Sequence, residues 1–199
     1  MNPTSRIGAT KMKTNKGVTF YFDLCSQCKS VCCQDARPPL SQNRMKVLKK
    51  YLEKQGIAAR KLFVTENYSY PAVDKQLFCC LFDKQTGKCS VHKVKPETCV
   101  SGPITFDINF KTGKVEWFLK KESICAYAGV LFSDKAALAA HLDVAKKELT
   151  QLIGELDADE LKTIVKIEEP QTFKIGEDEL TSETTSKLGC AKGIPRREA

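Results

Sequence analysis

The sequence predicts an α+β fold in which short β-hairpins combine with one helix in the N-terminal half and one long helix in the C-terminal half. Apolar and polar residues alternate over residues 104–119, which is the pattern of an antiparallel hairpin. After Ser41 and again after Asp134, apolar residues recur at the spacing of a helix. The chain has 199 residues, 42% of them hydrophobic, which is enough for one modest core.

The N-terminal part predicts an arm, a strand and a helix. Residues 1–17 are polar and basic without periodicity, so we expect a flexible basic arm. Residues 18–24 are rich in aromatic and β-branched side chains, which indicates a short strand. Ser41 is a suitable N-cap for a helix that continues to about Gln55. The apolar stripe of this helix consists of Met45, Leu48 and Leu52. A second short helix is expected within residues 57–64.

Two hairpins are predicted in the middle of the chain. Residues 77–83 and 88–91 flank a turn at residues 84–87 that ends in glycine. Residues 104–110 and 115–119 flank the second turn and alternate apolar with polar side chains. This period-two alternation is the strongest strand pattern in the chain.

The long helix of the C-terminal half follows. Ser133 or Asp134 caps it, it continues to about Ile153, and Gly154 suits the position after its last turn. The stripe expected to be buried consists of Leu138, Leu142, Ala145, Leu149 and Leu152. A stripe of this length places one face of the helix against the core.

A short helix and a polar tail are predicted after it. Asp157 and Glu160 have the spacing of a capping box. From Glu168 onward the composition shifts to Glu, Thr, Ser, Lys and Gly, so we expect residues 168–199 to be a disordered tail. The compact unit is then residues 18–167.

Ten cysteines stand in a chain in which we find no export or membrane segment. Residues 1–10 have no apolar stretch of the signal-peptide type, and no apolar run approaches the roughly 20 residues of a membrane span. We therefore expect a soluble, cytoplasmic protein without a membrane partner. Because disulfides are rare in a reducing cytosol, cysteines at short spacing predict metal ligands.

The strongest metal-binding pattern is the group Cys25, Cys28, Cys32 and Cys33. Two thiolates separated by two residues in a tight turn can point at one ion. Neighbouring side chains in extended backbone point apart, so the adjacent Cys32 and Cys33 predict either two metal centres or one large cluster. We expect the bound metal to hold this small fold together, which makes it a metal-nucleated domain.

A second group of cysteines comes later in the chain. It consists of Cys79, Cys80, Cys89, Cys99 and Cys125. Cys80 and Cys89 stand on the two arms of the first predicted hairpin, which brings them together. For Cys79 a buried apolar role is favoured over ligation. For His92, packing beside the site is favoured over chelation together with Cys89.

The two cysteine groups are expected to share a site. The N-terminal group readily supplies three thiolates, and a closed tetrahedral site needs a fourth, which the second group can give. His141 lies inside the long helix with no cysteine nearby, and Cys190 lies in the polar tail. Both are expected to be non-ligands.

The net charge of +8 is unevenly distributed, because residues 1–78 carry 14 Lys and Arg against 5 Asp and Glu. Three interpretations are open: a nucleic-acid surface, a solvated helix face with a basic arm, or Lys and Arg side chains that balance metal-bound thiolates. The solvated face is favoured and a nucleic-acid partner is the least favoured, because charge balance reports mainly on solubility and non-specific binding. A protein partner is expected but is not identified by the sequence.

The cysteines follow an ordered motif over residues 20–128. The motif is Cys25-x2-Cys28-x3-Cys32-Cys33, then Cys80-Leu81-Phe82, then Cys89-Ser90-Val91-His92-x3-Pro96-Glu97-x-Cys99, and then Cys125. This order resembles the YkgJ-type cysteine-cluster family, described as a zinc- or iron-chelating, iron–sulfur-cluster-containing domain. Pro96 and Pro103 also match. The resemblance implies eight metal ligands, which are Cys25, Cys28, Cys32, Cys33, Cys80, Cys89, Cys99 and Cys125.

The chain departs from the family pattern at several positions. Three residues rather than two separate Cys28 from Cys32, and His92 stands where the family usually has Tyr. Lys95 and Val100 replace two Arg residues, and Ala126 replaces the Pro after the last cysteine. The eight cysteines themselves remain in order.

The resemblance implies an iron–sulfur cluster of the 4Fe-4S type, with zinc as the alternative, and a role in electron transfer or cluster handling. Two other functions stay open: a zinc-stabilised interaction module, and an iron–sulfur-dependent enzyme such as a protein methyltransferase. The enzyme alternative is considered because a related cysteine motif occurs in flagellin lysine N-methylases. The sequence has no G-x-G-x-x-G loop, no P-loop and no G-x-S-x-G elbow, so it assigns no catalytic residue.

Overall fold

The computed structural model describes residues 12–13, 19–20, 32–167, 169 and 171–189. Its elements, in chain order, are β1 (Met12–Lys13), β2 (Thr19–Phe20), α2 (Gln42–Lys54), η1 (Ala59–Lys61), β3 (Phe63–Thr65), β4 (Ser69–Pro71), β5 (Phe82–Asp83), β6 (Lys88–Cys89), η2 (His92–Val94), α3 (Glu97–Ser101), β7 (Ile104–Asn109), β8 (Lys114–Lys120), α4 (Ala126–Ser133), α5 (Lys135–Glu155), α6 (Ala158–Ile164), β9 (Thr172–Glu179) and α7 (Ser182–Leu188). The predicted α+β fold class is confirmed.

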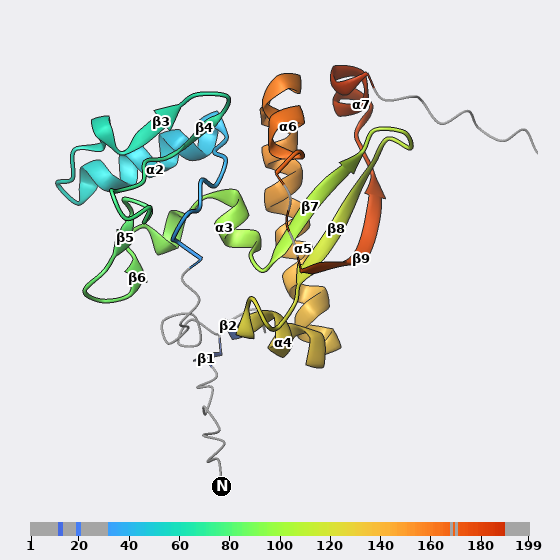
Figure 1. The fold of residues 1–199 in the computed structure, drawn as a ribbon, viewed down its shortest axis with the longest axis horizontal. Coiled ribbons are helices and arrows are strands. Elements are labelled where there is room, and N and C mark those ends of the chain that lie inside the picture. The colour runs from blue at the N-terminus through green and yellow to red at the C-terminus, as the bar shows by residue number, and fades with distance from the viewer. Residues whose placement is uncertain (1–11, 14–18, 21–31, 168, 170, 190–199) are drawn as a thin grey trace, which may run out of the picture.

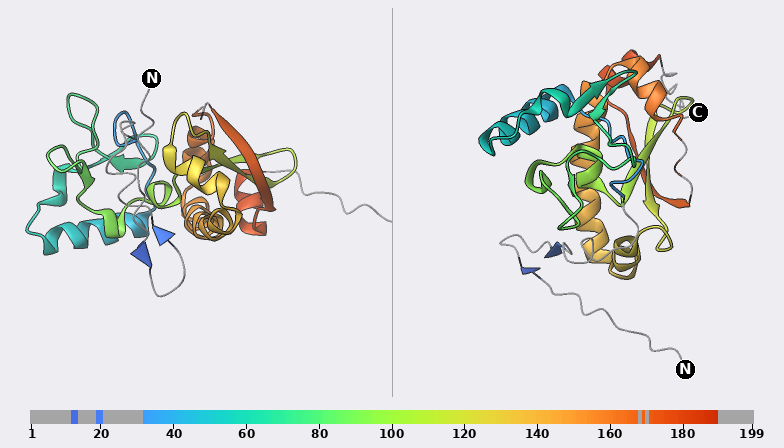
Figure 2. Two further views of the ribbon diagram at one scale, coloured as in Figure 1. Left: turned by 90° about the horizontal axis from the view of Figure 1, so that it is seen from below. Right: turned by 60° about the vertical axis from the view of Figure 1, so that its left-hand side comes forward.

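Two parts of the molecule lie side by side in Figures 1 and 2. The first lobe, residues 32–101, contains α2 and the short hairpins. The second lobe, residues 102–189, contains the sheet β7–β9 and the long helix α5. Of the predicted basic arm, Met12–Lys13 pairs with Thr19–Phe20, and the rest lies outside the described residues.

The helix of the first lobe begins where the sequence predicts it. Ser41 is the N-cap, and its Oγ accepts a hydrogen bond from the backbone N–H of Arg44 at 3.0 Å. The predicted apolar stripe is buried. The core of this lobe consists of Leu40, Leu48, Leu52, Ala59, Leu81 and Val91. Because Leu81 follows Cys80 and Val91 is two residues after Cys89, packing against α2 fixes the backbone that carries those thiols.

One of the two hairpins in the first lobe is predicted and the other is not. β5 and β6 pair across the expected turn, with Phe82 opposite Cys89. The sequence predicts a short helix within residues 57–64, whereas only η1 is helical and β3 pairs with β4. Pairing of the β-branched and aromatic residues of β3 with β4 outweighs a weak helical pattern.

The sheet of the second lobe has the strand order β7–β8–β9, all antiparallel. The β7–β8 hairpin agrees with the prediction. The expectation of a disordered tail is wrong for residues 171–189, because β9 pairs along all of β8 and α7 follows it. The indole Nε1–H of Trp117 donates to Asp178 Oδ2 at 2.6 Å. A sheet edge offers unpaired backbone groups, and these can order a segment that is too polar to fold alone.

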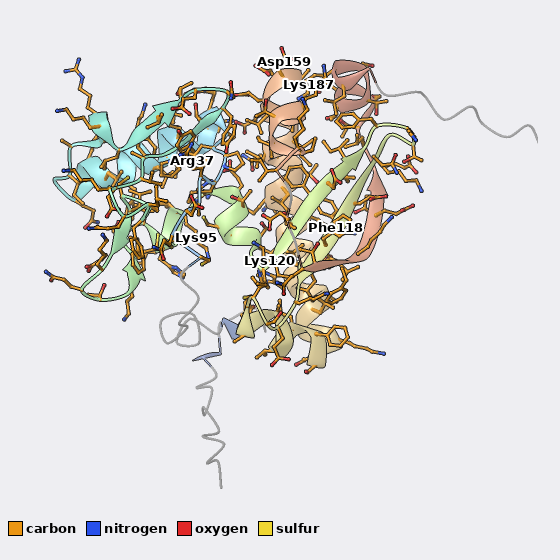
Figure 3. All side chains as sticks on the ribbon, in the orientation of Figure 1. Arg37, Lys95, Phe118, Lys120, Asp159 and Lys187 are labelled. Carbon is orange, nitrogen blue, oxygen red and sulfur yellow. The ribbon has the colours of Figure 1, made fainter. Side chains whose placement is uncertain are left out.

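Helix α5 has the predicted start but a different end. Asp134 caps it and accepts hydrogen bonds from two backbone N–H groups of the first turn. Gly154 is not its cap, because the helix continues to Glu155. The Lys187 ammonium of α7 donates to the carbonyls of Ile153, Gly154 and Leu156, and so satisfies the helix end without a glycine cap (Figure 3).

The shorter helices of the second lobe differ in how well they can be predicted. α6 has the expected capping box of Asp157 and Glu160. α4 has no sequence prediction, because its residues are apolar on most sides and show no helical stripe. No helix among the described residues is long and apolar enough to cross a membrane.

Helix α3 connects the two lobes and is held by buried polar contacts. The Arg44 guanidinium pairs with Glu148 of α5, lies 3.8 Å from the Glu97 carboxylate and donates to the Lys95 carbonyl at 3.1 Å. Glu97 is fully buried. From α5, the His141 ring contacts the carbonyl oxygens at the end of α3. These contacts fix the short helix that carries Cys99.

His141 is a buried structural residue, and its protonation should affect stability. Its Nε2 lies 3.0 Å from the Ser101 carbonyl oxygen and 3.1 Å from that of Gly102, so the neutral ring donates its proton to them. Burial lowers the pKa of His141 below its usual value, although the two carbonyls oppose the shift. The unfolded chain takes up a proton near pH 6.5 and the folded chain does so only at lower pH.

Stability should therefore be unaffected by His141 above about pH 6.5 and should fall as the pH drops below it, by at most about 1.4 kcal/mol per pH unit. We expect the melting temperature of the wild type to fall more steeply from pH 7 to 5.5 than that of His141→Gln, which keeps a donor but cannot titrate. Thermal melts of both proteins at equal metal load measure this. Parallel pH profiles would contradict the prediction.

Candidate metal centre

Five cysteine side chains line one hollow of the first lobe. They are Cys32, Cys33, Cys79, Cys89 and Cys99. The rest of the wall is mainly apolar and includes Pro38, Leu81, Phe82 and Pro96. The five thiols come from four segments of the chain, so the fold, rather than one local motif, gathers them. A wall of thiols and apolar groups suits a metal ion better than an organic substrate, which would need several placed polar groups.

Backbone hydrogen bonds hold these segments together. The Cys79 N–H donates to the Cys33 carbonyl at 2.8 Å, and Gln34 forms an isolated β-bridge with Phe78. Cys89 lies on β6 opposite Phe82, and Cys99 lies on α3. The adjacent pair Cys32-Cys33 is thereby fixed beside the segment that contains Cys79.

The other predicted ligands lie elsewhere or outside the described residues. Cys80 does not line the hollow, and its thiol lies 3.3 Å from the Leu62 carbonyl oxygen, to which it donates. Cys125 is the N-cap residue of α4 and packs against the core of the second lobe. Cys25 and Cys28 lie outside the described residues. The structure thus brings together four of the eight predicted ligands, Cys32, Cys33, Cys89 and Cys99.

The structure also places Cys79 and His92, which the sequence analysis does not count among the expected ligands. Cys79, for which a buried apolar role is favoured, is in the wall of the hollow. Its position next to Cys80, a residue of the cysteine motif, was the sequence signal that could have pointed to it. His92 lies in η2, is exposed, and is not part of the wall. Partial desolvation of its ring lowers the pKa of His92, and the charge of Lys95 adds to this.

The thiols Cys32 and Cys33 differ in acidity. A hydrogen bond between them, helped by the charges of Lys120 and Lys95 and opposed by burial, lowers the pKa of Cys32 to about 6. The same hydrogen bond and burial raise the pKa of Cys33 far above its usual value. Lys95 belongs to the first lobe and Lys120 to the second, and both are labelled in Figure 3 near the junction of the lobes. One thiolate is therefore present near neutral pH, with two cations to balance it.

Two other thiols of the hollow, those of Cys79 and Cys89, have raised pKa values. A hydrogen bond with Cys80, followed by burial, raises the pKa of Cys79. Burial raises the pKa of Cys89, and the thiols of Cys79 and Cys32 add to this while Lys95 opposes it. A metal ion binds thiolate, so it must displace these protons, and binding should be weaker at low pH.

Comparison with known proteins identifies the family. The CxxCxxCC family, described as "Putative zinc- or iron-chelating domain", matches residues 24–126. The chain belongs to the CxxCxxCC family. The resemblance drawn from the cysteine motif is confirmed. No curated protein and no solved structure matches the chain significantly.

Membership in the CxxCxxCC family agrees with metal binding of the zinc or iron kind. The matched region contains all eight predicted ligands and Cys79, and it excludes Cys190. No three His, Cys, Asp or Glu side chains among the described residues already stand as ligands of one ion. Ligation therefore requires rotation of thiols in the wall, or ligands such as Cys25 and Cys28 from outside the described residues.

Cys190 offers a direct check on the limits of the site. It lies beyond the region matched by the CxxCxxCC family. We expect full-length Cys190→Ser to keep the metal content and melting temperature of the wild type, because no ligand is removed. Metal analysis and a thermal melt of the two proteins measure this. Loss of one metal equivalent in the variant would place Cys190 in the site.

Proposed function

We propose that this CxxCxxCC protein carries an iron–sulfur cluster, of the 4Fe-4S type, and uses it for electron transfer or cluster handling. The observation that carries the proposal is the hollow lined by five thiols from four separate segments. An all-thiolate set suits both iron–sulfur clusters and zinc. Cys25 and Cys28, in the same sequence motif, would raise the number of thiols further.

The surplus of thiols favours a cluster over a single zinc ion. A structural zinc ion takes four ligands, and five thiols line the hollow without counting Cys25 and Cys28. Lys95 and Lys120 act on the thiols as cations, which supports an anionic centre with several thiolates. The charge of these two lysines fits the interpretation that basic residues balance the metal site.

The proposal includes a reducing compartment, the cytoplasm. Cys32, Cys33, Cys79, Cys80, Cys89 and Cys99 are all free thiols although several of them are close together. Adjacent thiols would be at risk of oxidation in an oxidising compartment.

The test is anaerobic purification of the full chain, followed by iron, zinc and acid-labile sulfide analysis and a visible spectrum. We expect iron and sulfide in equal amounts and the broad visible absorption of bridged iron, and we expect both to be lost in Cys89→Ser. Cys190→Ser is the matched control and should retain them. A colourless protein with stoichiometric zinc would contradict the iron–sulfur cluster and support a zinc-stabilised module instead. A protein without bound metal would contradict the proposal altogether.

A further inference from the structure

We infer that Cys79, rather than its neighbour Cys80, supplies the metal ligand of the segment before β5. This inference rests on the proposed metal centre. It departs from the family motif, in which Cys80 holds the matching position because Leu81 and Phe82 follow it. The distinction matters because the two residues are adjacent, so that a motif alone cannot say which thiol faces the metal.

The first observation is the position of Cys79. Its side chain lines the hollow together with those of Cys89 and Cys99. Its backbone N–H donates to Cys33 at 2.8 Å, and its carbonyl accepts from the Phe82 N–H at 2.9 Å. Cys79 is therefore tied on one side to the adjacent-cysteine pair and on the other to the hairpin that carries Cys89.

The second observation is the position of Cys80. Its thiol donates to the Leu62 carbonyl at 3.3 Å, and its N–H donates to the Ala72 carbonyl at 2.8 Å. Both partners belong to the β3–β4 hairpin region rather than to the hollow. Cys80 also packs against the core formed by α2 and its neighbours. A hydrogen bond with the Cys79 thiol connects Cys80 to a residue of the hollow.

Cys79 and Cys80 have different surroundings although they are neighbours in the chain. Cys80 follows Cys79 in the turn that the Phe82 N–H closes on the Cys79 carbonyl at 2.9 Å. In this turn the Cys80 thiol donates to the Leu62 carbonyl and does not line the hollow, whereas Cys79 does. A Cys80 ligand would have to give up its hydrogen bond to Leu62.

The inference completes a ligand set from residues that already line one hollow. Cys79, Cys89 and Cys99 supply three thiols, and Cys32 or Cys33 supplies the fourth. Four thiolates close a tetrahedral site. Neither Cys80 nor Cys125 is needed to complete it.

The experiment compares full-length Cys79→Ser and Cys80→Ser, loaded anaerobically with Co²⁺, whose thiolate charge-transfer absorption reports on the number of bound thiolates. We expect Cys79→Ser to lose about a quarter of that absorption per cobalt, which is one thiolate of four. Its affinity for Co²⁺ should fall by more than the roughly 10–100-fold that loss of an outer-shell partner causes. Cys80→Ser keeps a hydroxyl donor for Leu62 and should retain the full absorption.

Full absorption in Cys79→Ser with loss in Cys80→Ser would overturn the inference, and so would equal losses in both. A wild type that shows no thiolate absorption with Co²⁺ and holds no native metal would instead contradict the proposed metal centre itself. If Cys79→Ser does not fold, alkylation of the wild type decides the question. Bound metal should then protect Cys79 from the reagent and leave the alkylation rate of Cys80 unchanged. Protection of Cys80 in place of Cys79 overturns the inference.

Discussion

Removal of the metal with a chelator under reducing conditions should lower the melting temperature of the first lobe by more than about 10 °C. Structural zinc contributes on the order of 10 kcal/mol to the folding of small metal domains, which is comparable to the whole stability of a typical domain. For a chain of this size, about 5 kcal/mol already corresponds to roughly 10–20 °C. The six buried apolar residues at the core of this lobe cannot replace that contribution.

The effect should be confined to the part of the molecule that the thiols hold together. Cys32, Cys79, Cys89 and Cys99 join segments of the first lobe, whereas the sheet β7–β9 has a separate core around Trp117 and Leu149. Hydrogen exchange of the metal-free chain should show lost protection in β5, β6 and α3 and retained protection in β7 and β8. An unchanged melt in a sample verified to be metal-free would mean that the metal has no structural role.

The cysteine order and the helix caps could be predicted because they depend on local sequence. Ser41, Asp134 and Asp157 bond to backbone N–H groups within their own first turns, so their role can be recognised without the tertiary fold. The hairpin β7–β8 is predicted for the same reason, because its alternation and its turn lie in one short segment.

Strand β9 could not be recognised from composition, although its sequence contains a weaker signal. Phe173 and Ile175 alternate with polar residues, and both pack against the core of the second lobe. The segment contains too few apolar residues to predict order by itself. Its order depends on hydrogen bonds to β8, which is about fifty residues earlier in the chain, and no local pattern reports such a partner.

The candidate site was predictable in its residue types but not in its geometry. The spacing of Cys79 and Cys80 shows that one segment carries two thiols, but not which thiol faces the hollow. That choice is made by the Leu62 carbonyl and by the backbone contact with Cys33, both distant in sequence. Cys125 illustrates the same limit, because its place at the start of α4 turns it toward the core of the second lobe.

The chain that ends at Ile167 should lose the cooperative fold of the second lobe. This truncation removes β9 and α7, and with them the strand paired to β8 and the acceptor of the Trp117 indole N–H. It also exposes the surface that Ile175, Leu180 and Leu188 cover. Each large apolar side chain removed from a core costs about 2–5 kcal/mol, so the summed loss of more than about 5 kcal/mol approaches the total stability of a typical domain.

The matched control is the chain that ends at Gly189, which keeps β9 and α7 and lacks Cys190. Its melting temperature and metal content should equal those of the full chain. The chain ending at Ile167 should show no near-UV circular dichroism signal from Trp117 and no unfolding transition of the second lobe. The tail stabilises the second lobe in two ways: β9 pairs with β8, and Lys187 caps the end of α5. The variant Lys187→Met in the full chain distinguishes them, because it removes the capping hydrogen bonds but keeps the strand. If β9 provides most of the stability, Lys187→Met costs only about 1–2 kcal/mol. Equal melting of the chains ending at Ile167 and at Gly189 would show that the sheet is stable as the β7–β8 hairpin alone.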